Sequence, residues 1–143
     1  MNHCHTIAYR VYFEDTDLMG IIYHGRYLYF FERSRTEMLR DHGISLTTLA
    51  TYDTYFAIRD AHVRYLSPGR FDDLLTIKTS IEAMKGCVIL LKQTMNNQTG
   101  TLLAEATIQL VTVNQQLKPK RLPKEITSVL EPLCSTDTSV RCE

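Results

Sequence analysis

The chain has 143 residues, and its sixteen basic side chains balance sixteen acidic ones, so that the net charge is zero. A hydrophobic content of 44% with four prolines supports a packed core of ordinary domain size and excludes a disordered chain. The balanced charge argues against binding of DNA or RNA mainly through phosphates, because such proteins usually carry a basic excess.

The sequence shows no sign of membrane insertion or export. The longest unbroken apolar run, residues 87–91, is far shorter than the roughly 20 residues that a membrane-spanning helix needs. The N-terminus has no basic segment followed by an apolar one, so we expect a cytoplasmic protein with reduced cysteines. His3 and His5 flank Cys4, but no further ligand pair lies nearby, so we expect neither a metal ion nor a cofactor.

The first half of the chain predicts one strand and one long helix. Aromatic and β-branched residues alternate over residues 7–13, which is typical of a strand. An acidic turn at residues 14–17 follows, and the period becomes helical over residues 25–42. One face of this helix is apolar and should be buried, and a second face carries an i,i+4 charge pair between Arg33 and Glu37. The expected buried face consists of Tyr27, Phe30, Phe31, Ser34 and Met38.

The second half predicts mostly strands. Alternating or apolar segments lie at residues 54–66, 75–83, 87–95 and 102–114, and short turns between them favour antiparallel neighbours. Residues 123–130 predict a short helix. The pattern indicates an α+β class, with a curved antiparallel sheet around a mostly buried helix. We expect one domain over residues 1–132 and a flexible C-terminal tail over residues 133–143.

The acidic turn before the helix is the strongest candidate for chemistry. The sequence has no G-x-S-x-G, P-loop, G-x-G-x-x-G or H-E-x-x-H pattern. Asp17 precedes the helix, Gly20 loosens the turn, and Tyr23 and His24 lie at the helix start. Unpaired amides at a helix N-terminus can stabilise an oxyanion, and a nearby carboxylate can act as a general base or a nucleophile. On spacing alone, helix capping by Asp17 is the more common explanation, and Asp15 is expected to be a solvated turn residue.

The segment YRVYFEDTDLMGIIYHGRY, residues 9–27, resembles the N-terminal signature of the hotdog-fold thioesterases. Within that group it is most similar to the 4-hydroxybenzoyl-CoA thioesterase family and its YbgC-type acyl-CoA thioesterases. The stretches FFERSRTE, YLSPGRFDDLL and LAEA further along the chain look like the same family. The resemblance covers about residues 7–125. It implies a helix wrapped by an antiparallel sheet, an acyl-CoA or acyl carrier protein thioester as substrate, and a homodimer or homotetramer with its sites at subunit interfaces.

The resemblance also assigns roles to individual residues. Asp17 falls on the catalytic aspartate of the family, and His24 falls on the position whose backbone N–H faces the thioester carbonyl. The expected substrate-binding residues are Gly20, Ile22, Tyr23, His62, Arg64 and Ser67. Met19 and Arg26 depart from the small residue and the asparagine that the family often has there, so we expect them to narrow or recharge the acyl pocket.

The phosphates of CoA should meet cationic side chains. The candidates are Arg59, Arg64 and the densest basic cluster, which comprises Lys118, Lys120, Arg121 and Lys124. Two other functions remain open at this point: a hotdog hydratase or dehydratase, and a non-catalytic acyl-binding or envelope-associated scaffold protein. The presence of Asp17 favours hydrolysis over a scaffold role.

Overall fold

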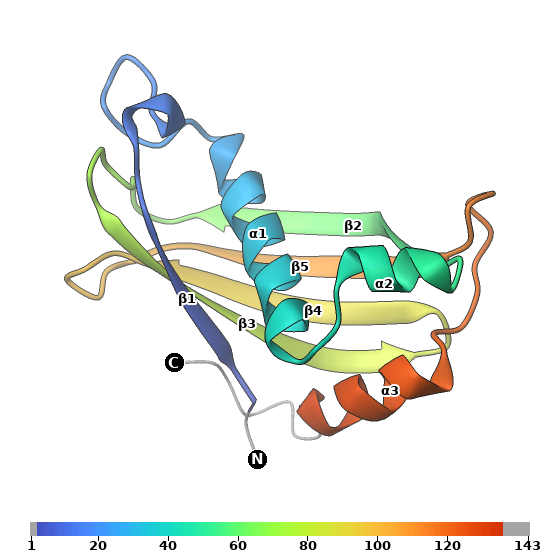
Figure 1. Cartoon of the computed structure of the whole chain (residues 1–143). Helices are drawn as coiled ribbons and strands as arrows, with labels where there is room; N and C mark the ends of the chain where they lie inside the picture. The colour runs from blue at the N-terminus through green and yellow to red at the C-terminus, as the bar shows by residue number, and fades with distance from the viewer. Residues whose placement is uncertain (1–2, 136–143) are drawn as a thin grey trace.

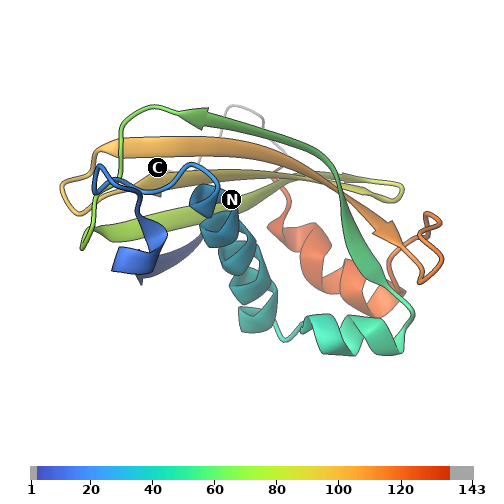
Figure 2. The same ribbon diagram turned by 90° about the horizontal axis from the view of Figure 1, so that it is seen from above.

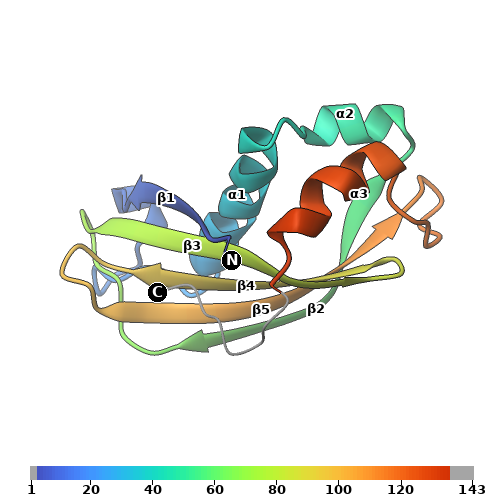
Figure 3. The same cartoon turned by 90° about the horizontal axis from the view of Figure 1, so that it is seen from below.

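A five-stranded antiparallel sheet, with helices on one of its faces, forms the computed structural model of this protein, which describes residues 3–135 (Figure 1). The strands are β1 (His5–Arg10), β2 (Tyr55–Tyr65), β3 (Leu74–Lys85), β4 (Val88–Asn96) and β5 (Leu102–Val113), in the spatial order β1-β3-β4-β5-β2. The helices are α1 (Arg26–Asp41), α2 (Leu46–Thr51) and α3 (Lys124–Leu130), and all three lie on the same side of the sheet (Figures 2 and 3). The α+β class and the order of the expected main elements are confirmed.

The long helix α1 packs its predicted apolar face on the sheet. The five side chains expected on that face are all buried, and Phe31 is completely inaccessible to solvent. Facing strand residues such as Leu75, Ile77 and Leu91 belong to the same core. Burial of a large apolar side chain contributes roughly 1.5–3 kcal/mol, so this face holds the helix start in a fixed position relative to the sheet.

A buried polar group also joins α1 to the sheet. The Gln93 side-chain amide donates to the Phe31 carbonyl at 2.9 Å and to the Thr79 hydroxyl at 2.9 Å. Its oxygen accepts a hydrogen bond from the Arg35 guanidinium at 3.0 Å, and burial lowers the pKa of Arg35. Both polar atoms of the Gln93 side-chain amide are hydrogen-bonded, so burying this amide leaves no polar atom unpaired. Its bonds fix the position of α1 relative to β4.

Four local expectations are corrected. The first strand ends at Arg10 rather than residue 13, and Phe13 lies 80% exposed in a short 3₁₀ helix, Phe13–Asp15. Helix α2 was not expected from the sequence; the Ser45 hydroxyl caps it by accepting the Thr48 N–H. The third correction is that the charge pair of α1 joins Glu37 to Arg40 rather than Arg33 to Glu37.

In that pair, the Arg40 Nε and the Glu37 Oε2 are 2.9 Å apart. Arg33 instead lies over the Phe30 ring. The fourth correction concerns Cys4, which is disulfide-bonded, whereas Cys87 and Cys134 are free thiols as expected. The spacing of cysteines in a sequence does not reveal which thiols the fold brings together.

The C-terminal part of the described chain is attached to the sheet. Cys134 forms a parallel bridge with Ile81, and the Ser135 N–H donates to the Ile81 carbonyl. The rest of the tail that we expect to be flexible, residues 136–143, lies outside the described residues. No described helix has the length and apolar character that crossing a membrane would require.

Candidate active site

The Asp17 turn is a narrow reversal of the chain between β1 and α1. Thr16 bridges Ile22 across it, the Asp17 N–H donates to the Ile21 carbonyl at 2.9 Å, and the Gly20 N–H donates to the Asp17 carbonyl at 3.0 Å. Gly20 has a φ of +76°, a left-handed conformation that glycine adopts without strain. The Asp17 Oδ1 accepts the Met19 N–H at 2.8 Å, which orients the carboxylate within the turn.

The loop between β2 and β3 holds this turn in place from the side. The Ile22 N–H donates to the Gly69 carbonyl at 2.8 Å, and the Phe71 N–H donates to the Gly20 carbonyl at 3.0 Å. A Cβ atom at Gly69 would lie 2.4 Å from Ile22 Cδ1, so a larger residue at this position would force the Ile22 side chain to move. A segment some fifty residues away in the sequence therefore sets the position of the Asp17 turn.

No side chain caps the start of α1. Gly25 is the N-cap residue and offers no capping side chain, and the Arg26 N–H, the first amide of the helix, donates to the Tyr23 carbonyl at 2.8 Å. The Asp17 carboxylate binds the Met19 amide instead of the helix amides. Capping of α1 therefore does not account for Asp17, and the positive end of the helix dipole remains available to an oxyanion.

Two tyrosines fix the backbone at the helix start. The Tyr65 hydroxyl donates to the His24 carbonyl at 3.0 Å, and the Tyr65 ring packs edge-on against Tyr27 at 5.0 Å between centroids. The Tyr27 hydroxyl accepts the Gly69 N–H at 3.2 Å, and burial raises the pKa of Tyr27. The His24 ring itself is exposed, and its centroid lies 4.3 Å from that of the Tyr23 ring.

A buried ion pair lies beside the same turn. Asp15 is only 4% exposed, and its Oδ1 accepts hydrogen bonds from Arg26 Nε at 3.0 Å and Nη2 at 2.6 Å. Its Oδ2 accepts the Tyr12 N–H at 2.8 Å. The expectation of a solvated Asp15 is therefore wrong. Because its guanidinium is bound to Asp15, Arg26 is not a free charge that could recharge an acyl pocket.

The predicted site residues fall into two groups. Asp17, Gly20, Ile22, Tyr23 and His24 share one loop, and Ser67 lies two residues before Gly69 in the loop that contacts it. His62 and Arg64 lie elsewhere, as their register in β2 shows.

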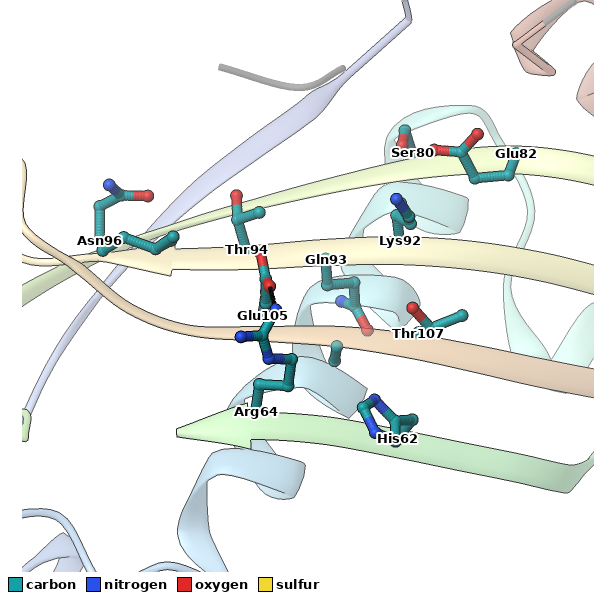
Figure 4. A pocket seen from close by; sticks show the side chains of 12 residues that line it. His62, Arg64, Ser80, Glu82, Lys92, Gln93, Thr94, Asn96, Glu105 and Thr107 are labelled. Atoms are coloured by element: carbon teal, nitrogen blue, oxygen red, sulfur yellow. Dashed lines mark hydrogen bonds and ion pairs between the residues drawn. The ribbon is translucent and has the colours of Figure 1, made fainter. Parts of the chain in front are cut away.

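His62 pairs with Thr107 and Arg64 with Glu105, and these residues point to the sheet face opposite α1. There they line a cavity of about 520 Å³ together with Ser80, Glu82 and Lys92 (Figure 4). Arg64 Nη1 lies 3.0 Å from Glu105 Oε1. A single chain thus does not bring His62 or Arg64 to Asp17.

The basic cluster is also distant from Asp17. Residues 118–124 lie at the end of the molecule opposite the Asp17 turn (Figures 1 and 2). The Lys120 ammonium donates to the carbonyls of Tyr52 and Asp53 at 2.8 and 3.2 Å, so it holds the end of α2 rather than a ligand. Arg121 and Lys124 line a separate cavity beside α3.

Sequence reasoning missed the residues that support the turn from a distance, namely Arg26, Tyr65, Tyr27 and Gly69. Nothing in the sequence indicates that Tyr65 reaches the His24 carbonyl, because the two residues are 41 positions apart in the chain.

Comparison with known proteins agrees with this arrangement. The sequence pattern that defines the thioesterase-like superfamily matches residues 11–130, so the chain belongs to the thioesterase-like superfamily, and its fold is the hotdog fold. The acyl-CoA thioester hydrolase YbgC of Escherichia coli O6:H1 is 44% identical over 118 residues, which cover 82% of this chain and 88% of that protein.

Two further relatives extend the likeness. The acyl-CoA thioesterase YbgC of Haemophilus influenzae is 37% identical over 126 residues, which cover 87% of this chain and 92% of that protein. The crystal structure of a probable thioesterase from Bartonella henselae has a TM-score of 0.80 at 38% identity and covers 84% of this chain and 99% of that chain. The resemblance inferred from the turn and helix motifs is therefore confirmed.

Proposed function

We propose that this protein hydrolyses the thioester bond of an acyl-CoA, with Asp17 as the catalytic carboxylate and the His24 backbone N–H, at the positive end of α1, as the oxyanion-binding donor. The observation that carries the proposal is the Asp17 turn itself. It orients the carboxylate through the Met19 N–H, and the chain runs directly from this turn into an uncapped helix start. The names of the E. coli and H. influenzae relatives support the same reaction and the same substrate class.

The reaction follows from these groups. The thioester carbonyl docks with its oxygen toward the His24 N–H at the start of α1, where negative charge develops during attack. Asp17 either takes a proton from an attacking water or attacks the carbonyl carbon itself to form a mixed anhydride that water then cleaves. In both routes the C–S bond breaks, the acyl group leaves as a carboxylic acid, and the thiolate of CoA takes up a proton.

The surroundings of the turn support completion of the site by a second copy of the chain. Leu18, Met19, Tyr23 and Phe71 near Asp17 expose large parts of their apolar side chains. Strand β2 is at the edge of the sheet, with β5 as its partner on one side, and Ile58 in it is 52% exposed. A long edge strand has backbone groups on its open side that can pair with another chain. We therefore propose a homodimer joined through β2, alone or as half of a homotetramer.

The subunit arrangement can be measured directly. Sedimentation velocity should give a dimer or tetramer for the natural chain, and Ile58→Lys should shift it toward monomer and lower its activity. Thr47→Lys on the exposed side of α2 is the matched control and should leave the mass unchanged. A natural chain that is monomeric and fully active would contradict a site shared between copies.

Within this site we propose that Asp17 and His24 act on the thioester and that Gly20, Ile22, Tyr23 and Ser67 shape the cavity around it. His62 and Arg64 face away from Asp17 in one chain, so a contact with the substrate would have to come through a second copy. Alanine variants of His62 and Arg64 test this role: a raised KM at unchanged kcat supports substrate binding, and unchanged kinetics argues against it.

The test of the function is release of free thiol from a panel of aliphatic and aromatic acyl-CoAs and an acyl carrier protein thioester. We expect hydrolysis by the natural chain and a kcat about 10²–10⁴-fold lower for Asp17→Asn, the usual contribution of a positioned acid–base group. Glu125→Gln in α3 is the control. Substrate binding without thiol release by either protein would replace the enzyme with an acyl-binding protein, and hydration of an enoyl-CoA would indicate a hydratase.

We also propose that the protein acts in the cytoplasm, where acyl-CoA thioesters are made and consumed. Cell fractionation with antibodies tests the location. The disulfide at Cys4 is a second readout, because a cytoplasmic protein should carry Cys4 as a thiol that labels with maleimide after rapid lysis.

A further inference from the structure

The ion pair between Asp15 and Arg26 is more deeply buried than its position in a surface turn suggests. The Asp15 side chain is 5% exposed and that of Arg26 is 21% exposed, and the Arg26 guanidinium also lies 4.7 Å from the centroid of the Tyr29 ring. A buried carboxylate without a cation is strongly destabilising, so Asp15 depends on Arg26. Both guanidinium contacts go to the same Asp15 oxygen, which leaves the other oxygen for the Tyr12 N–H.

Arg26 is poorly suited to its place in the helix on local grounds. It is the first residue of α1, and the first turn of α1 contains no acidic residue to balance it. A cation at the positive end of a helix dipole is unfavourable by roughly 0.3–1 kcal/mol. The pairing with Asp15 accounts for this arginine, whereas the helix alone does not.

Asp15 connects the three segments that surround Asp17. Its carboxylate binds the Tyr12 N–H before the turn and the Arg26 side chain after it. Its backbone carbonyl accepts the Tyr23 N–H at 2.9 Å. Asp17 follows Asp15 by two residues, so the contacts of Asp15 determine where the Asp17 turn lies relative to the helix start.

The pair also affects the charge at the helix start. An unneutralised carboxylate at Asp15 would oppose the negative charge that develops on the thioester oxygen beside the start of α1. The Arg26 guanidinium cancels that charge at hydrogen-bond distance. The helix start therefore keeps its positive potential although a buried aspartate lies next to it.

We propose that Asp15 and Arg26 are positioning residues of this enzyme, which hold the Asp17 turn against the start of α1 and keep that start electrostatically positive. The proposal rests on the function proposed above. Neither residue acts on the substrate directly. Their effect reaches the reaction through the placement of Asp17 and of the helix start, and a displacement of about 1 Å can cost a factor of about 10² in rate.

The test is a set of matched variants assayed for thiol release. Arg26→Gln leaves Asp15 unpaired and should lower kcat about 10–100-fold with KM changed less than about threefold. The double variant Asp15→Asn/Arg26→Gln removes both charges and should recover much of the lost kcat. Arg26→Lys keeps the positive charge but cannot make both guanidinium contacts, and its kcat should lie between those of Arg26→Gln and the natural chain. Arg40→Gln, which removes the exposed ion pair at the other end of α1, should retain full kcat.

A second readout does not need activity. Hydrogen exchange at the amides of Tyr12, Met19 and Tyr23 should be faster in Arg26→Gln than in Arg40→Gln, because the first two amides bind aspartate side chains and the third binds the Asp15 carbonyl. If Arg26→Gln fails to fold, Arg26→Lys supplies the same measurement.

The outcomes separate the two proposals. Full kcat and unchanged exchange in Arg26→Gln would overturn the positioning role while the hydrolase function stands. If the double variant has the same kcat as Arg26→Gln, the ion pair contributes only to stability, and the positioning role is overturned as well. If the natural chain hydrolyses no thioester, the proposed function fails, and unchanged exchange would then overturn the positioning role independently.

Discussion

The two faces of the sheet differ in a way that bears on where the chemistry takes place. The face opposite α1 has a hollow of about 520 Å³ lined by several titratable side chains, including His62, Arg64, Glu82 and Lys92. The face that carries α1 has a small turn with one oriented carboxylate, Asp17, beside an uncapped helix start.

Thioester hydrolysis needs donors fixed around a developing oxyanion, which backbone amides supply and long flexible side chains do not. The cavity opposite α1 contains more ionisable groups, but the strands beneath it use their amides in the sheet. The placement of backbone amides, rather than the size of a cavity, is therefore the basis on which we propose the Asp17 turn as the active site.

The most direct test of this difference is to substitute residues on both faces of the sheet and to assay the variants side by side. Asp17→Asn should lower kcat about 10²–10⁴-fold, because it removes the charge of the carboxylate while keeping its shape. Glu82→Gln and Lys92→Ala in the opposite cavity should change kcat/KM less than about twofold, as expected for surface substitutions. Steady-state thiol release measures all three. If only the Glu82 and Lys92 variants lose activity, the active site lies on the sheet face opposite α1.

The close approach at Gly69 should be the next most sensitive feature. Gly69→Ala places a Cβ against Ile22 and should lower the free energy of unfolding by about 1–3 kcal/mol, together with kcat. Adding Ile22→Val removes the clashing Cδ1 and should restore part of both. Chemical denaturation and thiol release give the values.

Gly100→Ala is the matched control for Gly69→Ala. Gly100 has a φ of +83° but has open space around the position of a Cβ, so this variant carries backbone strain alone. It should lose stability without losing kcat. If Gly69→Ala behaves like Gly100→Ala, the contact with Ile22 does not position the turn.

A similar loss of stability is expected at Gln93, but without a catalytic effect. Gln93→Leu leaves the Arg35 guanidinium and the Phe31 carbonyl without their partner and should cost about 1–3 kcal/mol of folding free energy. Because Gln93 contacts the middle of α1 rather than its start, kcat should stay within about twofold. Gln109→Leu on the opposite face is the control. A large fall in kcat would show that the helix start depends on the whole length of α1.

The smallest effect is expected at Tyr65. Tyr65→Phe removes the hydrogen bond to the His24 carbonyl and should cost about 0.5–1.5 kcal/mol, appearing partly as a several-fold lower kcat. Tyr55→Phe at the other end of β2 should leave kcat unchanged. Equal behaviour of the two variants would mean that the orientation of the His24 carbonyl does not depend on Tyr65.

Much of the fold could be predicted because its patterns are local. The apolar face of α1 and the alternation in β3, β4 and β5 follow from side-chain periodicity, and the structure buries the expected residues except Ala83, which is exposed beyond the register shift between Ile81 and Ala83. The end of β1 could not be predicted, because the 3₁₀ turn that carries Phe13 depends on the contact between the Tyr12 N–H and the Asp15 carboxylate. Residue type alone left Phe13 looking like one more strand residue.

The candidate site shows the same division. Asp17, Gly20 and His24 stand close together in the sequence, so a motif can indicate them. His62 and Arg64 were expected near Asp17 because the strand that contains them was expected near the site. Whether a strand side chain faces α1 depends on the register of that strand, and a shift of one residue moves the side chain to the other face.

The α+β class, the buried side of α1, the superfamily and the place of the acidic turn before α1 could be inferred from the sequence, because local patterns of residues indicate them. Three features became visible only in the folded structure: Asp15 is buried against Arg26, Ile22 packs closely against Gly69, and His62 lies on the sheet face opposite α1. These features depend on contacts between distant segments, and the energy of such a contact becomes defined only when the packed core has fixed the distance between them.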